Sequence, residues 1–482
     1  MKKLIIFLLP FLFLAGCKKD LTSLNDDPKN PSTVPSYALF TNAQKTLART
    51  LSSANVNLNI FRLIEQYWTE TTYTDESNYD LQTRQIPRGM WNALYRDVLK
   101  DFEEAKNTIP KDIVDPSTQQ ADAPRQKNEL AIVDIMQVYT WYYLVTTYGD
   151  VPYTEALNID NPFPKYDSQA TIFADLLKRL DADIAALDPA SASFGSEEII
   201  YGGDPAMWKK FAATFKLKVG MTLADIDPAA SRAAVESAIT SGIFTSNADN
   251  AEFKFLTGPP NTNPIWEDLV QSGRKDFVIA NTIADTMVTL NDPRVPFYFT
   301  PDASNTKFSG GIPGDPNNWQ AYSKPSAKVT TADFPALLLD YCETEFFLAE
   351  AKERGYNVPG TAEDHYNSAI TASIEYWGGS TDNATAYFAN PNVSYKTAGI
   401  DYQQKIGLQK WLALYNRGAD AWIETRRLDN PVLPPPTTAV SDFPVRFTYS
   451  VDEQNINTTN YNAAAKAIGG DAVTTRLFWD VK

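Results

Sequence analysis

The chain has 482 residues, which is enough to bury one large hydrophobic core or two modest ones. Its 43 Lys and Arg against 59 Asp and Glu give a formal net charge of −16, and a surface this acidic argues against binding to nucleic acid or a polybasic grip on anionic lipid. One histidine excludes multi-histidine metal sites, two cysteines exclude a disulfide scaffold or a Cys-rich zinc site, and we expect neither a cofactor nor a structural metal.

The amino terminus indicates export. Two lysines precede the apolar residues 4–15, which Pro10 interrupts, and this stretch is too short for a helix that crosses a bilayer and needs about 20 residues. It ends in Leu14-Ala15-Gly16-Cys17, which resembles a bacterial lipobox. We therefore expect residues 1–16 to be a lipoprotein signal peptide; a plain signal peptide with a chance cysteine is the alternative.

A lipobox implies that the thiol of Cys17 accepts diacylglycerol, and two or three acyl chains anchor a protein stably where one chain does not. Residues 17–36, rich in Asn, Asp, Pro and Ser towards their end, then form a lipid-anchored linker. The remainder, 37–482, is expected to be a single domain.

Helical periodicity recurs along that domain, with apolar residues at i, i+3, i+4 and i+7. The expected helices cover 37–53, 59–70, 91–105, 130–148, 169–187, 208–219, 229–241, 340–354, 362–377 and 408–423. Trp91, Trp208, Trp411 and Trp422 lie on these stripes and are expected in the core. Weaker strand signals cover 253–256, 295–300 and 445–449.

Two features define the expected architecture. Phe346 to Ala351, Gly355 and the helix 362–377 resemble a tetratricopeptide helix pair, in which small residues allow two helices to cross closely. Residues 257–334 and 430–462 are long irregular segments rich in Pro, Asn, Asp and aromatics, and such loops are often functional. We expect a mainly α fold, a tetratricopeptide-like helical-repeat scaffold with long irregular loops and a few short β-hairpins.

Several short motifs recur in a fixed order behind the lipobox. They are NDDPKNP at 25–31, FFLAEA at 346–351, QKWLALYN at 409–416, AWIETRR at 421–427, PVRF at 444–447, NYNAA at 460–464, GGD at 469–471 and LFWD at 477–480. Together they resemble the SusD/RagB family of nutrient-binding outer-membrane lipoproteins of Bacteroidetes, over nearly the whole mature chain. The lysines at 18 and 19 depart from an acidic export signal.

The resemblance implies a surface-facing, lipid-anchored lid on a SusC-like TonB-dependent transporter of the outer membrane. Such a protein captures oligosaccharides, or peptides in the RagB-type branch, and is not an enzyme. Two alternative hypotheses for the function stay open. One is a surface glycoside hydrolase, which needs two carboxyl groups placed across a bond, and the other is an interaction protein that serves only the barrel.

Sugar capture requires flat aromatic faces for the C–H patches of a pyranose, and polar side chains for its hydroxyls. Aromatic and polar residues off the helical stripes are therefore the candidates for ligand binding. They are Tyr73, Asn78, Tyr79, Trp266, Arg274, Asp276 and Trp319. Ordinary loop packing is the alternative for each aromatic.

Two further side chains carry reactive groups. His365 is expected on a solvated helix surface, because no nucleophile can be assigned to it. Cys342 shares a stripe with Phe346 and Ala349 and is expected to be an inert buried thiol. Loop Asp and Asn residues leave a calcium site open, although no EF-hand spacing is present.

Overall fold

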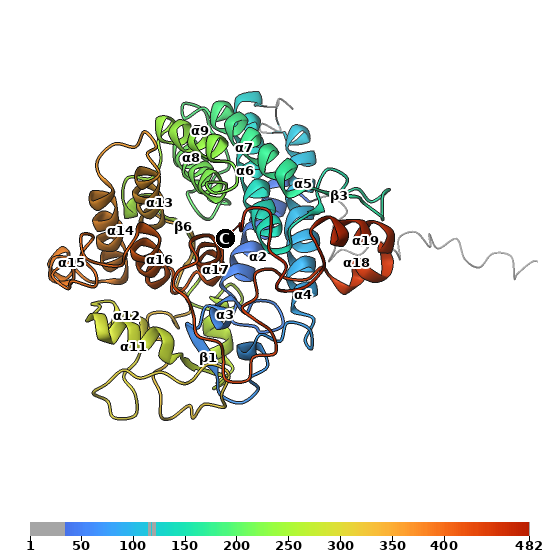
Figure 1. Ribbon diagram of the computed structural model, residues 1–482. Helices are drawn as coiled ribbons and strands as arrows, with labels where there is room; N and C mark the ends of the chain where they lie inside the picture. Colours follow the sequence, from blue (N-terminus) through green and yellow to red (C-terminus); the bar gives the residue numbers. More distant parts are fainter. Residues whose placement is uncertain (1–33, 114–116, 118–121, 482) are drawn as a thin grey trace, which may run out of the picture. The chain divides into compact units, whose positions relative to one another are not determined.

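The computed structural model describes residues 34–113, 117 and 122–481, and Ser36–Lys482 form one compact unit (Figure 1). The predictions for the signal peptide, for Cys17 and for nearly all of the linker lie outside the described residues. No helix within the described ranges combines the length and the apolar character that crossing a membrane requires.

The predicted mainly α fold is confirmed. Helices in chain order are α2 (Ser36–Ser52), α3 (Phe61–Ile64), α4 (Ile86–Asn92), α5 (Lys100–Thr108), α6 (Ala123–Tyr148), α7 (Gln169–Ala186), α8 (Pro205–Thr222), α9 (Pro228–Ser241), α10 (Pro264–Trp266), α11 (Asn281–Leu290), α12 (Val295–Tyr298), α13 (Tyr341–Glu353), α14 (Ala362–Trp377), α15 (Thr381–Phe388), α16 (Tyr402–Ala413), α17 (Gly418–Leu428), α18 (Val451–Ile456) and α19 (Thr458–Ala467). Single turns and π-helical stretches add η3 (Glu76–Asn78), η4 (Ala93–Leu99), η5 (Ile109–Lys111), η6 (Asn247–Asp249) and η7 (Glu267–Gln271).

Strands are short and form three two-stranded antiparallel sheets. β1 (Trp68–Glu70) pairs with β5 (Phe277–Ile279), β2 (Val151–Pro152) with β3 (Tyr166–Asp167), and β4 (Ala251–Phe253) with β6 (Ala336–Leu339). The first and third sheets join segments that lie far apart in the sequence. Each therefore fixes a loop of one region against another.

Consecutive helices pack as pairs: α6 with α7, α8 with α9 and α13 with α14 (Figure 1). Their starts are set by side chains, because Ser168, Asp204, Asp227 and Thr361 each accept a hydrogen bond from a backbone N–H of the first turn. The pairing matches the expected tetratricopeptide-like scaffold.

The core follows the predicted stripes. Trp91, Trp208, Trp411 and Trp422 are buried, as is Cys342. Helix α6 is buried on nearly every side from Asn128 to Tyr148, which makes it the central helix of the scaffold. These predictions are confirmed.

Buried charges tie the central helices to one another. Lys218 of α8 donates to Glu343 of α13 at 2.9 Å, and Arg417 donates to the same carboxylate at 2.7 Å. A second cluster joins Arg427 of α17 to Glu350 of α13 at 2.6 Å. Because each charge in these two clusters has an opposite partner, removing one partner would leave the other uncompensated in the core.

Four local predictions are wrong. The helix expected over 59–70 ends at Ile64, because Gln66 adopts a left-handed φ of 52° and the chain continues into β1. The strand expected over 295–300 is instead helix α12, since Pro296 lacks the N–H of a ladder but fits a first helical turn. Residues 445–449 form no strand. The strand expected over 253–256 instead covers Ala251–Phe253, which is β4.

His365 also differs from its prediction. Its Nδ1 lies 2.7 Å from the Glu345 carboxylate and its Nε2 lies 2.7 Å from the carbonyl oxygen of Pro359. The half-buried ring is thus held between α13 and the loop before α14. Its pKa is raised, because those two hydrogen bonds favour the charged ring over the opposing cost of burial.

The segments predicted to be irregular hold the elements around the candidate site. Residues 257–334 contain the short elements α10, η7, β5, α11 and α12 between loops. The chain is irregular from 430 to 450, and α18 begins at Val451. In Figure 1, β1, α3, α11 and α12 lie together on one side of the paired helices.

Candidate functional site

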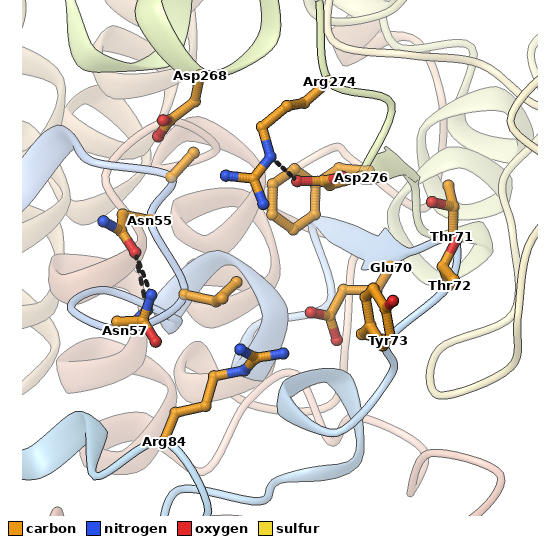
Figure 2. A pocket seen from close by; sticks show the side chains of 13 residues that line it. Asn55, Asn57, Glu70, Thr71, Thr72, Tyr73, Arg84, Asp268, Arg274 and Asp276 are labelled. Carbon is orange, nitrogen blue, oxygen red and sulfur yellow. Dashed lines mark hydrogen bonds and ion pairs between the residues drawn. The ribbon is translucent and has the colours of Figure 1, made fainter. Parts of the chain in front are cut away.

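A pocket of about 160 Å³ lies where the end of β1, the loop after it and the approach to β5 meet (Figure 2). Three of the predicted ligand-binding residues, Tyr73, Arg274 and Asp276, line it. The volume is smaller than that of clefts for drug-sized ligands, so the pocket suits one sugar ring or the end of a chain.

The antiparallel pairing of β1 with β5 brings these residues together. Glu70, the last residue of β1, pairs with Phe277, and the N–H of Thr71 donates to the carbonyl of Asp276 at 2.9 Å. The hydroxyl of Thr71 donates to the carbonyl of Lys275 at 2.7 Å. Tyr73 therefore lines the same pocket as Arg274 and Asp276 although the two segments are distant in sequence.

Tyr73 supplies an open aromatic surface, because 73% of the residue is exposed. Such a ring has apolar faces and a polar hydroxyl, the combination that a pyranose can contact. Across the pocket, Asn55 and Asn57 add exposed amides, and the Asn57 Nδ2 donates to the Asn55 Oδ1 at 3.0 Å (Figure 2).

Arg274 and Asp276 form the charged rim. Nε of Arg274 pairs with Asp276 Oδ2 at 2.7 Å, and the arginine side chain is 62% exposed. Its remaining N–H groups form the planar fork that suits vicinal oxygen acceptors. Burial raises the pKa of the nearby Asp268 carboxyl, and Arg274 opposes that effect. The rim thus offers both donors and acceptors.

Two further residues that line the pocket, Glu70 and Arg84, are not among the predicted ligand-binding residues. Glu70 is buried and lines the pocket with Arg84, and Arg84 forms an ion pair with the fully buried Glu76. Burial first, and then the neighbouring Glu76, raise the pKa of Glu70 to about 8. The role of Glu70 could not be predicted, because residues 59–70 have the sequence pattern of a helix. The only indication in the sequence is that Glu70 and Glu76 flank Tyr73, which lies off the helical stripes.

Two predicted ligand-binding residues are placed inside the protein. Asn78 and Tyr79 are only 4% and 3% exposed. Asn78 Nδ2 donates to the carbonyl of Gly314 at 2.8 Å, and the Tyr79 hydroxyl accepts a hydrogen bond from Gln66 at 3.2 Å. Their side chains hold loops together inside the protein, and binding by either residue stays a prediction.

The two predicted tryptophans lie outside this pocket. Trp266 is half-buried at the end of α10, and it does not line the pocket. Trp319 is half-buried, and the Nζ atoms of Lys275 and Lys324 lie 4.9 and 4.8 Å from its ring centre. Both lysines make cation–π contacts with the ring. Binding by either tryptophan stays a prediction.

No group of three or more His, Cys, Asp or Glu side chains is arranged to hold a metal ion in the part of the chain that the structure describes. The pocket instead combines an exposed phenol, amides, a guanidinium and carboxyl groups. This set can bind a hydroxylated ligand through hydrogen bonds and one stacking contact.

Comparison with known proteins gives a consistent result. The model of a family described as starch-binding and associating with the outer membrane (SusD-like) matches residues 28–450. None of the curated proteins matches the chain. Among solved structures, a chitin-binding protein is 24% identical with a TM-score of 0.80, covering 93% of this chain and 100% of its own.

Two further structures share the fold. A chitin-binding SusD homologue from Flavobacterium johnsoniae is 22% identical with a TM-score of 0.76, covering 93% of this chain and 98% of its own. A SusD homologue from Bacteroides uniformis is 25% identical with a TM-score of 0.76, covering 92% and 99%. The family model spans most of the chain, so the protein belongs to the SusD-like family of carbohydrate-binding proteins that associate with the outer membrane.

Proposed function

We propose that this protein is a cell-surface lipoprotein that captures oligosaccharides in the pocket beside Tyr73 and delivers them to a SusC-like TonB-dependent transporter without cleaving them. The observation that carries the proposal is the convergence of Tyr73, Arg274 and Asp276 on one pocket. Anchoring through Cys17 and an outward orientation rest on the lipobox in the sequence. Delivery to a transporter rests on membership of the family.

The chemistry of the pocket favours a sugar that carries both hydroxyl and amide groups. Arg274, Asp276, Asn55 and Asn57 offer donors and acceptors around one open aromatic ring. Two structures of the same fold are named as chitin-binding. Oligosaccharides of N-acetylglucosamine are therefore the first ligands to test, and Trp266 and Trp319 are candidates for contacts with a longer chain.

Titration calorimetry tests the proposal with chito-oligosaccharides, malto-oligosaccharides and a set of short peptides. Arg274→Ala should weaken the preferred glycan by about tenfold to a hundredfold, since a hydrogen bond from a charged group contributes about 1.5–3 kcal/mol. Arg96→Ala is the matched control, because Arg96 is 71% exposed on its side chain and pairs with Asp97 at 2.6 Å, as Arg274 does with Asp276.

The outcomes separate the functions. Equal affinity in the wild type and Arg274→Ala would place the site elsewhere. Preference for peptides would identify the RagB-type branch. New reducing ends in the glycan solution after incubation would show that the protein is a glycoside hydrolase and would overturn the proposal.

A further inference from the structure

The single histidine of the chain joins α13 to the loop that leads into α14. His365 lies near the start of α14, and its side chain is half-buried. Its Nδ1 lies 2.7 Å from the carboxylate of Glu345 on α13, and its Nε2 lies 2.7 Å from the carbonyl oxygen of Pro359 in the loop. Both ring nitrogens therefore have a partner on a neighbouring segment.

Both atoms that face the ring are hydrogen-bond acceptors. An ionised carboxylate and a peptide carbonyl can accept hydrogen bonds but cannot donate them. A neutral imidazole carries one N–H, so it can donate to one of the two oxygens, and its other nitrogen then directs a lone pair at an oxygen 2.7 Å away. The charged ring donates to both oxygens. The contacts of His365 are thus satisfied in full by the imidazolium form.

The ionisable groups around the ring act in the same direction. Burial disfavours the charged ring, but the bonds to its two partners and the carboxylates of Glu345 and Asp364 outweigh that cost, so the pKa of His365 is raised. Asp364 adjoins the histidine on α14, and hydrogen bonds from the capping residue Thr361 lower the pKa of its carboxyl. Tyr341, one turn before Glu345 on α13, has its pKa raised to about 12 by burial and is neutral near pH 7.

The loop between α13 and α14 is held at several points along its length. Its first half is tied to α9 by the Tyr356 hydroxyl, which donates at 3.0 Å, and to α13 by Lys352, whose Nζ donates to a carbonyl of the loop at 2.8 Å. The second half, residues 359–361, leads into the capping box of α14. Here the ring of His365 holds the carbonyl of Pro359.

We infer that His365 is a pH-sensitive clasp of the α13–α14 pair, which is closed by the imidazolium and opens at the Pro359 carbonyl when the ring loses a proton. The neutral ring keeps its N–H on the stronger acceptor, the charged Glu345 carboxylate. The lone pair of Nε2 then faces the Pro359 oxygen, and their repulsion releases residues 359–361. The clasp belongs to the scaffold, so it holds whether or not the pocket beside Tyr73 binds a glycan.

Because the chain contains one histidine, a single nuclear magnetic resonance titration measures the charge of the clasp. The full chain is labelled with isotopic histidine and purified without a histidine tag. At pH 6.5, the ordinary pKa of histidine, most of the ring should carry protons on both nitrogens, and the titration midpoint should lie above 6.5. A midpoint at or below 6.5 would overturn the inference, as would a neutral ring at that pH.

A pair of variants tests the contribution of the carboxylate. Glu345→Gln keeps an acceptor oxygen but removes the charge, so it should lower the midpoint by about one pH unit. Glu363→Gln is the matched control, because Glu363 also lies in the first turn of α14 but pairs with Lys396 at 3.5 Å. Equal midpoints in Glu345→Gln and Glu363→Gln would overturn the assignment of Glu345 as the partner that keeps the ring charged.

Hydrogen exchange, corrected for the intrinsic rate, tests whether the loop opens. Peptides covering 359–366 should lose protection as the pH rises through the midpoint of the wild type, and peptides covering 370–377, later in α14, should not. His365→Gln has a side chain that does not titrate, so it should show no such step. Equal protection of 359–366 on both sides of the midpoint would overturn the clasp even if the ring is charged.

Urea unfolding measures the same switch as a free energy. Because the pKa of His365 is higher in the folded state than in the unfolded state, the clasp contributes its full stability below pH 6.5 and loses it as the pH rises through the folded midpoint. The difference between the wild type and His365→Gln isolates this contribution from other titrating groups. Parallel stability profiles of the two proteins from pH 5 to pH 9 would overturn it.

Discussion

Replacing Tyr73 by alanine should reduce the affinity for a captured glycan without changing the fold. The residue is 73% exposed, so its removal leaves no cavity in the core. A tyrosine side chain offers roughly 150–250 Å² of surface, of which a sugar lying on one face covers about 60 Å². At about 25 cal/mol per Å² this contact contributes about 1.5 kcal/mol, or about tenfold in Kd.

Calorimetry with a chito-oligosaccharide measures the effect, with thermal unfolding as the test of an intact fold. Tyr37→Ala is the matched control, because Tyr37 is 45% exposed at the start of α2 and does not line the pocket. Tyr73→Phe should retain most of the affinity, since it keeps the ring. Binding of the glycan by Tyr73→Ala as tight as that of the wild type would show that this ring does not contact the ligand.

Three further predictions concern stability and anchoring. The pKa of Glu350 is lowered from 4.5 to about 2, because the ion pair with Arg427 outweighs the cost of burial. The ionised carboxylate therefore contributes about 3 kcal/mol to the free energy of unfolding. This contribution is present above pH 4.5 and is lost as the pH falls towards 2. Glu350→Gln should therefore lower the free energy of unfolding in urea by about that amount at pH 7 and flatten the acid limb, and an unchanged acid limb would contradict this. Cys342 is buried, and that burial raises the pKa of its thiol. In a Cys17→Ser variant, Cys342 should therefore react with a thiol reagent only after unfolding. Rapid labelling of the native protein would be inconsistent with the structure. The same Cys17→Ser change should abolish incorporation of labelled palmitate and release the protein from membranes, and continued labelling would show that the anchor is attached elsewhere.

The long helices could be predicted from the sequence because their apolar stripes and caps are local signals. The helix expected over 362–377 has those bounds in the structure, and Thr361 and Asp364 close its first turn in a capping box. The prediction for 59–70 failed because its apolar residues are shared between α3 and β1. No local pattern encodes the strand pairing that separates them.

The candidate site was predicted in part. Tyr73, Arg274 and Asp276 are polar or aromatic residues outside the apolar helical stripes, which made them candidates. In the structure all three line one pocket. Asn78 and Tyr79 carried the same signal, yet contacts with Gly314 and Gln66 bury them. Burial by segments distant in the sequence is a tertiary property, so chemical type alone could not separate these two groups.

The base of the pocket illustrates the same limit. Burial raises the pKa of Glu70, and Glu76 is buried in an ion pair with Arg84. Acidic residues are ordinarily solvated, but Glu70 is buried at the end of β1, which pairs with the sequence-distant strand β5.

The most direct test of glycan capture at this pocket is a crystal structure of the protein with a chito-oligosaccharide, determined at neutral pH. We expect a sugar ring against Tyr73, with its oxygen atoms within hydrogen-bond distance of the Arg274 guanidinium. A sugar bound only at Trp266 or Trp319, or an empty pocket at a ligand concentration that saturates binding in solution, would contradict it.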